Sequence, residues 1–146
     1  MHTTAPRRLG SVGILLILVL VIPSVLLAGC SGRVSDRSIE PIAQADAQRR
    51  LDEKSGTTLF LDARDPEAFS DGHIPGARRT GLSEIDLMDD RPRFGAWDLI
   101  VVYGQDPGSA TARALVKRLL QTNHKNVALL EGGFAGWERA GLPVER

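Results

Sequence analysis

The chain has 146 residues with 18 basic and 18 acidic side chains, and 42% of its residues are hydrophobic, which suffices for one globular domain of about 100 residues and an extension. Arg7 and Arg8 lie in the first 29 residues, which contain no acid, so the remainder has 16 basic and 18 acidic side chains. This charge balance, without a basic cluster interleaved with aromatic residues, argues against a nucleic-acid partner. Cys30 is the only cysteine, which excludes an internal disulfide and a multi-cysteine metal site.

Residues 1–29 have the pattern of a bacterial lipoprotein signal peptide. Two arginines precede an apolar run over 12–28, and residues 27–30 (LAGC) resemble a lipobox, in which a dedicated signal peptidase cleaves before the cysteine and the thiol becomes acylated. The apolar run is also almost long enough to span a bilayer, so a retained membrane anchor is the alternative. In both cases the domain is tethered to a membrane. Residues 30–42 are predicted to be a polar linker that starts with lipidated Cys30.

The predicted location is therefore the bacterial cell envelope. Ser31, which follows the lipidated cysteine, is compatible with sorting to the outer membrane, facing the periplasm, if the host has two membranes. In a host with a single membrane, the domain would lie on the outer face of the plasma membrane.

The folded domain is predicted for residues 43–146, and Ile39, just before it, is considered as a short edge strand. Apolar residues recur at helical spacing over 43–51, and the run 57–61 (TTLFL) is expected to form a strand. Asp65 followed by Pro66 is typical of a helix N-cap and the first helical position, which predicts a short helix after this strand.

The central stretch of the chain follows a predicted strand at 77–79 and a short predicted helix at 80–88. Residues 99–103 (LIVVY) are apolar without polar alternation, which is typical of a strand covered on both faces in a parallel sheet. A Gly/Pro loop over 104–108 ends this strand, and Ser109 is the expected N-cap of an amphipathic helix. Such a loop directs backbone N–H groups to one point, where an enzyme of this architecture places an attacking side chain.

Several side chains near these elements have a structural and a functional interpretation. Phe94 and Trp97 either cover the sheet edge or contact a partner, and core packing is favoured. His124 lies in a polar connection and is expected to be solvated. After the last predicted strand, 127–130, Trp137 is expected to anchor the core.

Two separated motifs resemble those of the rhodanese family. The first comprises Asp62-Ala63-Arg64, Glu67, Phe69 and 72–77 (GHIPGA), and the second comprises 131–134 (EGGF), Trp137 and 141–144 (GLPV). They occur in the correct order, and the resemblance covers roughly residues 43–146. It implies a three-layer α/β/α domain with a five-stranded, mostly parallel sheet, of the kind that carries sulfurtransferases and related dual-specificity phosphatases.

The first motif favours structural over catalytic roles. Arg64 and Glu67 are either a catalytic pair or a partly buried ion pair that fixes the turn, and the ion pair is favoured. His73 is flanked by turn formers and lacks an identifiable partner, so we expect it to shape the start of a strand rather than to act as a general base. Asp62 and Trp137 are assigned structural roles as well. Two histidines after the leader, without ligand spacing, predict no metal site, and no cofactor is expected.

Gly104 is the decisive position in the comparison with active rhodaneses. In active members, the strand matching 100–103 leads directly into a cysteine that carries sulfur as a persulfide, and the resemblance places Gly104 there. Glycine cannot hold sulfur, and lipidation would consume the Cys30 thiol. A left-handed backbone at Gly104 is a further possible reason for glycine. The rest of the loop contains one acid and no basic residue of the kind that active sulfurtransferases often carry: Gln105, Asp106, Pro107, Gly108 and Ser109.

The sequence thus favours a membrane-tethered rhodanese-like domain without cysteine-based catalysis, acting as a binding or scaffolding module. Its expected partners are the membrane, through the lipid on Cys30, and an envelope protein or a small anionic ligand. The alternative is a sulfurtransferase or another rhodanese-fold enzyme whose nucleophile is not a cysteine or is supplied by a partner. Ser109 has no base near it in the sequence, so helix capping is its expected role. A purely structural envelope protein is the third possibility.

Overall fold

The computed structural model describes Met1 and residues 34–53, 56–87 and 94–146. Residues Gly32–Arg146 form one compact unit. Residues 2–33, which comprise Cys30 and all of the predicted signal peptide except Met1, lie outside the described residues, so cleavage and lipidation remain predictions. Among the described helices, none is long and apolar enough to cross a bilayer.

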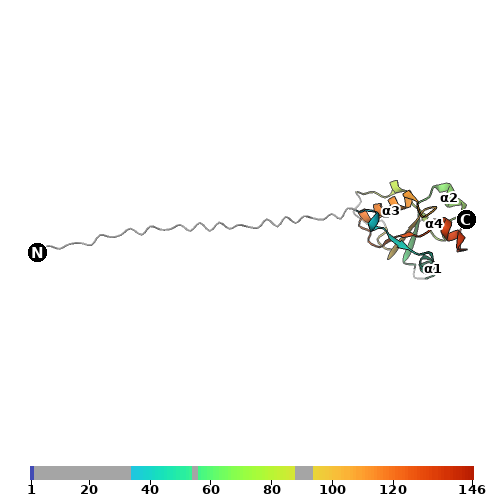
Figure 1. The fold of residues 1–146 in the computed structure, drawn as a ribbon, viewed down its shortest axis with the longest axis horizontal. Coiled ribbons are helices and arrows are strands. Elements are labelled where there is room, and N and C mark those ends of the chain that lie inside the picture. Colours follow the sequence, from blue (N-terminus) through green and yellow to red (C-terminus); the bar gives the residue numbers. More distant parts are fainter. Residues whose placement is uncertain (2–33, 54–55, 88–93) are drawn as a thin grey trace. The chain divides into compact units, whose positions relative to one another are not determined.

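One sheet of five strands forms the centre of the domain, and every strand pairing in it is parallel (Figure 1). The strand order is β1-β5-β4-β2-β3. The strands are β1 (Glu40–Ile42), β2 (Thr58–Asp62), β3 (Arg78–Arg79), β4 (Leu99–Tyr103) and β5 (Val127–Leu130). The α/β class and the five strands are as predicted, and the sheet is wholly rather than mostly parallel.

Helices connect these strands, and two of them begin at the expected caps, Asp65 and Ser109. The elements are η1 (Asp36–Ser38), α1 (Gln44–Asp52), α2 (Pro66–Asp71), η2 (Leu82–Glu84), α3 (Ala110–Gln121) and α4 (Gly133–Arg139), with η denoting a 3-10 helix. Asp65 caps α2, because its carboxylate accepts the backbone N–H of Ala68 at 2.8 Å. Pro66 then occupies the first helical position, where its missing N–H costs no intrahelical bond.

Two hydrophobic clusters lie on opposite faces of the sheet, because successive side chains of a strand alternate between the faces. In β4, Ile100 and Val102 belong to a cluster with the buried face of α3, which includes Leu115 and Leu119. Val101 and Tyr103 belong to the other cluster, which the remaining helices complete with Ala47 of α1 and Phe134 and Trp137 of α4. Both faces of β4 are covered, which explains its unbroken apolar sequence and confirms the three-layer α/β/α arrangement.

The ordered domain begins before the predicted boundary at residue 43. Strand β1 lies within residues 30–42, which the sequence assigns to the linker, and pairs along β5 from Glu40 to Ile42. Three residues are too few to show a strand period, and Pro41 is tolerated because β1 is an edge strand. Asp36 of η1 also contacts α3, since its carboxylate accepts a hydrogen bond from Lys117 Nζ at 2.9 Å, which lowers the pKa of Asp36.

Three further local expectations are tested by the fold. The helix predicted at 80–88 is only the three-residue η2 within its described part. Phe94 is buried and Trp97 packs on the same cluster, so the core-packing interpretation is confirmed. The solvated position predicted for His124 is wrong. His124 is only 7% exposed, and its ring nitrogens contact the backbone N–H of Phe94 at 3.3 Å and the Thr122 hydroxyl at 3.1 Å.

Candidate functional site: the loop between β4 and α3

The predicted loop leaves the carboxyl end of the central strand, the edge at which parallel α/β proteins place their sites. β4 ends at Tyr103, and Ser109 is the N-cap of α3. The Ser109 hydroxyl accepts the N–H of Ala112 at 3.4 Å and lies 3.1 Å from the Thr111 hydroxyl. The expected capping role of Ser109 is therefore confirmed.

Gly104 is buried, and the space beside it is filled by Ser109. A Cβ atom added at Gly104 would lie 2.1 Å from Ser109 Oγ and 2.4 Å from Ser109 Cβ. The backbone of Gly104 is not left-handed, so that expected reason for glycine is wrong. The close approach of Ser109 is what requires glycine here, and sequence reasoning missed it because the two residues meet only when the loop folds back.

Helix α4 holds the loop from the other side. Phe134 and Ala135 donate their backbone N–H groups to the carbonyl oxygens of Gly104 and Gln105, at 2.8 and 2.9 Å. Gly133 has a φ of 60°, and a Cβ there would lie 2.8 Å from the Gly104 oxygen. The second of the two glycines before Phe134 therefore allows α4 to dock against the loop.

The loop contains its own anion. The Asp106 carboxylate accepts the backbone N–H of Gly108 at 2.8 Å, and the Asp106 carbonyl accepts that of Ser109 at 3.2 Å. A loop amide is thus used by a side chain of the same loop, and the negative charge of Asp106 opposes a second anion in the same place.

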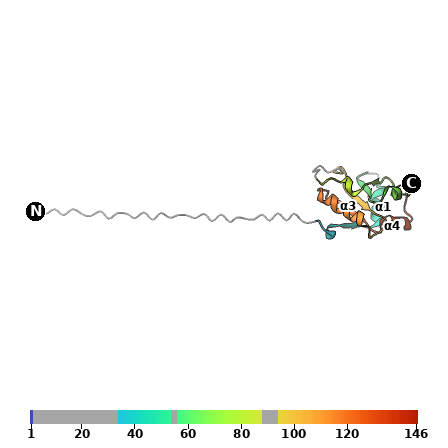
Figure 2. The same ribbon diagram turned by 90° about the horizontal axis from the view of Figure 1, so that it is seen from above.

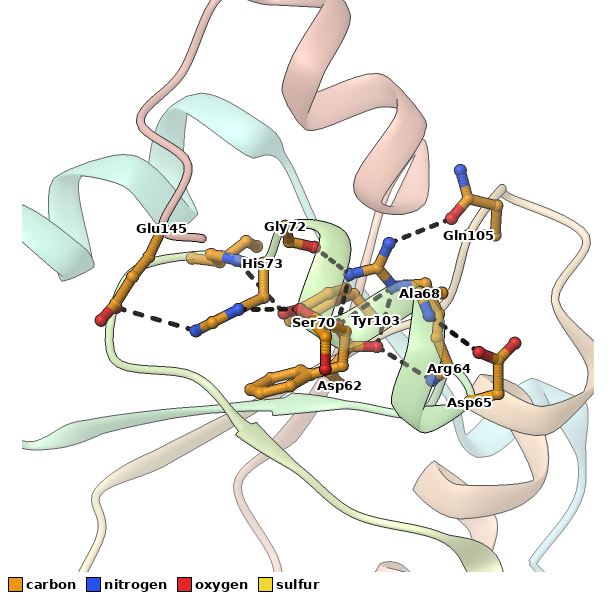
Figure 3. Close-up of polar contacts among 12 residues, drawn as sticks. Asp62, Arg64, Asp65, Ala68, Ser70, Gly72, His73, Tyr103, Gln105 and Glu145 are labelled. Carbon is orange, nitrogen blue, oxygen red and sulfur yellow. Dashed lines mark hydrogen bonds and ion pairs between the residues drawn. The ribbon is translucent and has the colours of Figure 1, made fainter.

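A buried ion pair lies beneath the loop, between Arg64 and Asp62 (Figure 3). Arg64 Nη2 lies 2.6 Å from Asp62 Oδ2 and also donates to the Gly72 carbonyl at 2.6 Å, while Nη1 donates to Gln105 Oε1 at 3.1 Å. The ion pair predicted for Arg64 exists, but its partner is Asp62 rather than Glu67, which is exposed on α2. The strand-end carboxylate lies closer to the guanidinium than the helical one does.

Two aromatic rings complete this cluster. The guanidinium carbon of Arg64 lies 3.9 Å from the ring centre of Phe134 and 5.8 Å from that of Tyr103, geometry that stabilises a cation. The Tyr103 hydroxyl accepts the N–H of Ile74 at 3.3 Å. Burial and the neighbouring Asp62 carboxylate strongly raise the pKa of Tyr103. Arg64 therefore connects β2, the end of α2, the loop and α4.

His73 and Trp137 make hydrogen bonds to the C-terminal segment of the domain. His73 and Glu145 exchange two backbone hydrogen bonds of 2.8 Å, and the His73 ring stacks on Phe69 with 3.9 Å between ring centres. Figure 3 shows the His73 and Glu145 side chains facing each other, and in Figure 2 the C-terminus lies beside α2. Trp137 is fully buried and donates its indole N–H to the Pro143 carbonyl at 2.7 Å. Both side chains are thus placed in structural contacts.

The loop brings the Ser109 hydroxyl to the N-terminus of α3, but it does not place a base beside that hydroxyl. The contacts of Ser109 described above are to a threonine and a backbone amide, while the two histidines of the folded part contact other regions. Within residues 34–53, 56–87 and 94–146, no group of three His, Cys, Asp or Glu side chains is arranged to hold a metal ion.

Comparison with known proteins identifies the family. Residues 43–140 match the family model described as the rhodanese-like domain, so the chain belongs to the rhodanese-like family. It is 26% identical to a putative thiosulfate sulfurtransferase of Synechococcus elongatus over 97% of this chain and 49% of the relative. The chain thus spans about half the length of that relative.

Two solved structures are similar in fold. A protein of unknown function from Rhodopseudomonas palustris, titled a possible tyrosine phosphatase, has a TM-score of 0.64 and 28% identity over 85% of this chain and 99% of its own. A thiosulfate sulfurtransferase from Pseudomonas aeruginosa has a TM-score of 0.62 and 29% identity over 73% of this chain and 19% of its own. The α/β fold with its parallel sheet is therefore the rhodanese-like fold.

Proposed function

We propose that this rhodanese-like domain is a binding module, held at a membrane by a lipid on Cys30, that performs no persulfide chemistry. The observation that carries the proposal is the packing of Ser109 against Gly104. The Ser109 hydroxyl lies where the side chain of a residue at 104 would begin, so Ser109 occupies the space that such a side chain would need. With Gly104 at the position of the family's sulfur-carrying cysteine, the site has no thiolate nucleophile.

The contacts of the loop support binding rather than turnover. Two carbonyl groups of the loop bind α4, and one amide binds Asp106, which is exposed beside the former site. These contacts stabilise the loop without a reactive side chain. A stable loop on a rigid sheet is a surface that a partner or ligand can recognise.

A purified fragment of residues 32–146 tests this proposal, because the complete sheet and both hydrophobic clusters lie within it. We expect neither thiocyanate from thiosulfate and cyanide nor phosphate from p-nitrophenyl phosphate, a substrate included because one relative is titled a possible tyrosine phosphatase. Both rates should equal those without protein. Turnover that persists through purification and disappears in Ser109→Ala would instead assign a serine nucleophile and overturn the proposal.

A further inference from the structure

A pocket of about 570 Å³ lies beside the loop, between the segment after β3 and the surface of α3. Arg79 and Ser83 line it on one side, and Thr111 and Arg118 of α3 line it on the other. Thr111 connects the pocket to the loop, since its hydroxyl lies 3.1 Å from that of Ser109. The pocket is therefore next to the position of Gly104 but outside the loop itself.

Two arginine side chains from different elements line this pocket, together with one acid, Asp65. Arg79 Nη1 donates to Glu84 at 2.7 Å, but Arg79 Nε is buried and has no hydrogen-bond partner among the described residues. Arg118 is partly buried, and no acidic side chain in the described part of the chain forms an ion pair with it. A buried N–H group without an acceptor is unfavourable, and the charge of Arg118 is not balanced by an ion pair of its own.

The one acid that lines the pocket does not supply the missing acceptor. Asp65 uses Oδ1 to cap α2, where it accepts the N–H of Ala68 at 2.8 Å. An oxyanion in the pocket would accept N–H groups of Arg118 in charge-assisted hydrogen bonds and would lie beside the guanidinium of Arg79. Leu82 also lines the pocket and is 37% exposed, which is unusual for a large hydrophobic residue in this domain. Its position favours a ligand with an apolar part.

We propose that this pocket binds a small organic oxyanion, such as a phosphate ester, with its charged group on Arg79 and Arg118 and its apolar part on Leu82. The inference rests on the proposed binding role and gives it a ligand class. The anion is expected in the pocket rather than in the loop, because the pocket has two arginines beside its one acid, Asp65, whereas the loop has Asp106 and no basic residue.

The test uses phenyl phosphate and inorganic phosphate as probes of the ¹⁵N-labelled fragment 32–146. The Nε–H signals of arginine are followed by NMR in slightly acidic buffer. We expect phenyl phosphate to shift the Arg79 and Arg118 signals in a saturable way. Arg118→Gln should weaken binding by about tenfold, because it removes a charge-assisted contact. Leu82→Ser should reduce the preference for phenyl phosphate over inorganic phosphate.

Arg113→Gln is the matched control, since it removes the same charge from the same helix. Arg113 faces Asp36 at 3.5 Å and does not line the pocket, so binding should change by less than about twofold. Equal weakening by Arg113→Gln and Arg118→Gln would mean non-specific attraction and would overturn the site. No shift of the Arg79 and Arg118 signals at millimolar phenyl phosphate would overturn it as well.

A lipid headgroup is an alternative source of the same oxyanion. Vesicles of phosphatidylglycerol in phosphatidylcholine form a separate arm: binding that Arg118→Gln abolishes would assign the site to a lipid phosphate, and binding of phenyl phosphate alone would assign it to a soluble ester. The sulfur-transfer assay is independent of these results. If the pocket binds no oxyanion, the proposal that the domain performs no persulfide chemistry still stands. Sulfur transfer would refute the proposed function whatever the pocket binds.

Discussion

Gly104 and Ser109 are predicted to be energetically coupled, which a double-mutant cycle can measure. Gly104→Ala adds the single carbon that would lie 2.4 Å from Ser109 Cβ. Rotation of the Ser109 hydroxyl cannot relieve this contact, because Cβ is fixed by the backbone. The loop or the first turn of α3 must therefore move in the single variant.

The expected magnitudes follow from the two contacts. Overpacking of a buried position costs about 1–3 kcal/mol, so Gly104→Ala should lower the free energy of unfolding by that amount. Ser109→Gly removes the hydroxyl cap of α3, but glycine is itself an acceptable N-cap, and the loss is a few tenths of a kcal/mol. In the double variant the clash is absent, so its loss should be smaller than the sum by about 1–2 kcal/mol.

Urea unfolding of the fragment 32–146, followed by circular dichroism, measures all four corners of the cycle. Ala110→Gly replaces Ser109→Gly in a control cycle, because Ala110 starts the same helix and is exposed. That cycle should be additive. If the losses of unfolding free energy in Gly104→Ala and Ser109→Gly are also additive, the two side chains do not compete for one space. The packing of Ser109 would then not explain the glycine at 104.

The same reasoning gives two further expectations. Cys30→Ala in the full chain should block cleavage of the leader and acylation, which mass spectrometry of the membrane fraction would detect, and an unmodified Cys30 in the wild-type membrane form would contradict the lipoprotein assignment. Arg64→Leu should lower the free energy of unfolding by about 3–5 kcal/mol, because it leaves the fully buried Asp62 without its cation. Arg50→Leu is its control, since Arg50 and its partner Glu53 are about half exposed, and that loss should stay below about 1 kcal/mol in urea unfolding.

The elements with long, uniform patterns were predictable from the sequence. Strand β4 and helix α3 lie where the apolar run and the helical spacing place them, because each has enough residues to show its period. β1 was expected only roughly, as a short edge strand at Ile39, for the opposite reason. It has three residues and includes Pro41, and its pairing with β5 depends on a partner almost ninety residues away.

The candidate site shows the same division between local and distant contacts. The caps by Asp65 and Ser109 are local and were predictable. The partner of Arg64 depends on where the strand end projects its side chains, and the sequence-based interpretation paired Arg64 with Glu67, whereas the observed partner is Asp62. The polar neighbours of His124 are typical of a loop residue, yet His124 is buried and its Nε2 accepts the backbone N–H of Phe94, 30 residues earlier. Contacts between residues that are far apart in the sequence leave no local sequence pattern from which they could be predicted.

Tyr103 gives a direct optical test of the packing beneath the loop, because it is the only tyrosine in the chain. Burial and the Asp62 carboxylate raise the pKa of Tyr103, so the folded protein retains this proton at a pH where the unfolded chain, with a tyrosine pKa of about 10, releases it. The folded state then binds more protons than the unfolded state, and stability falls as the pH rises above about 10. Phenolate absorbance should stay flat through that range and rise only together with unfolding, as measured by circular dichroism. In Tyr103→Phe, the fall in stability above pH 10 should be shallower. Ionisation near pH 10 in a protein that is still folded would show that Tyr103 reaches solvent, and that the Asp62, Arg64 and Phe134 cluster is not closed over it.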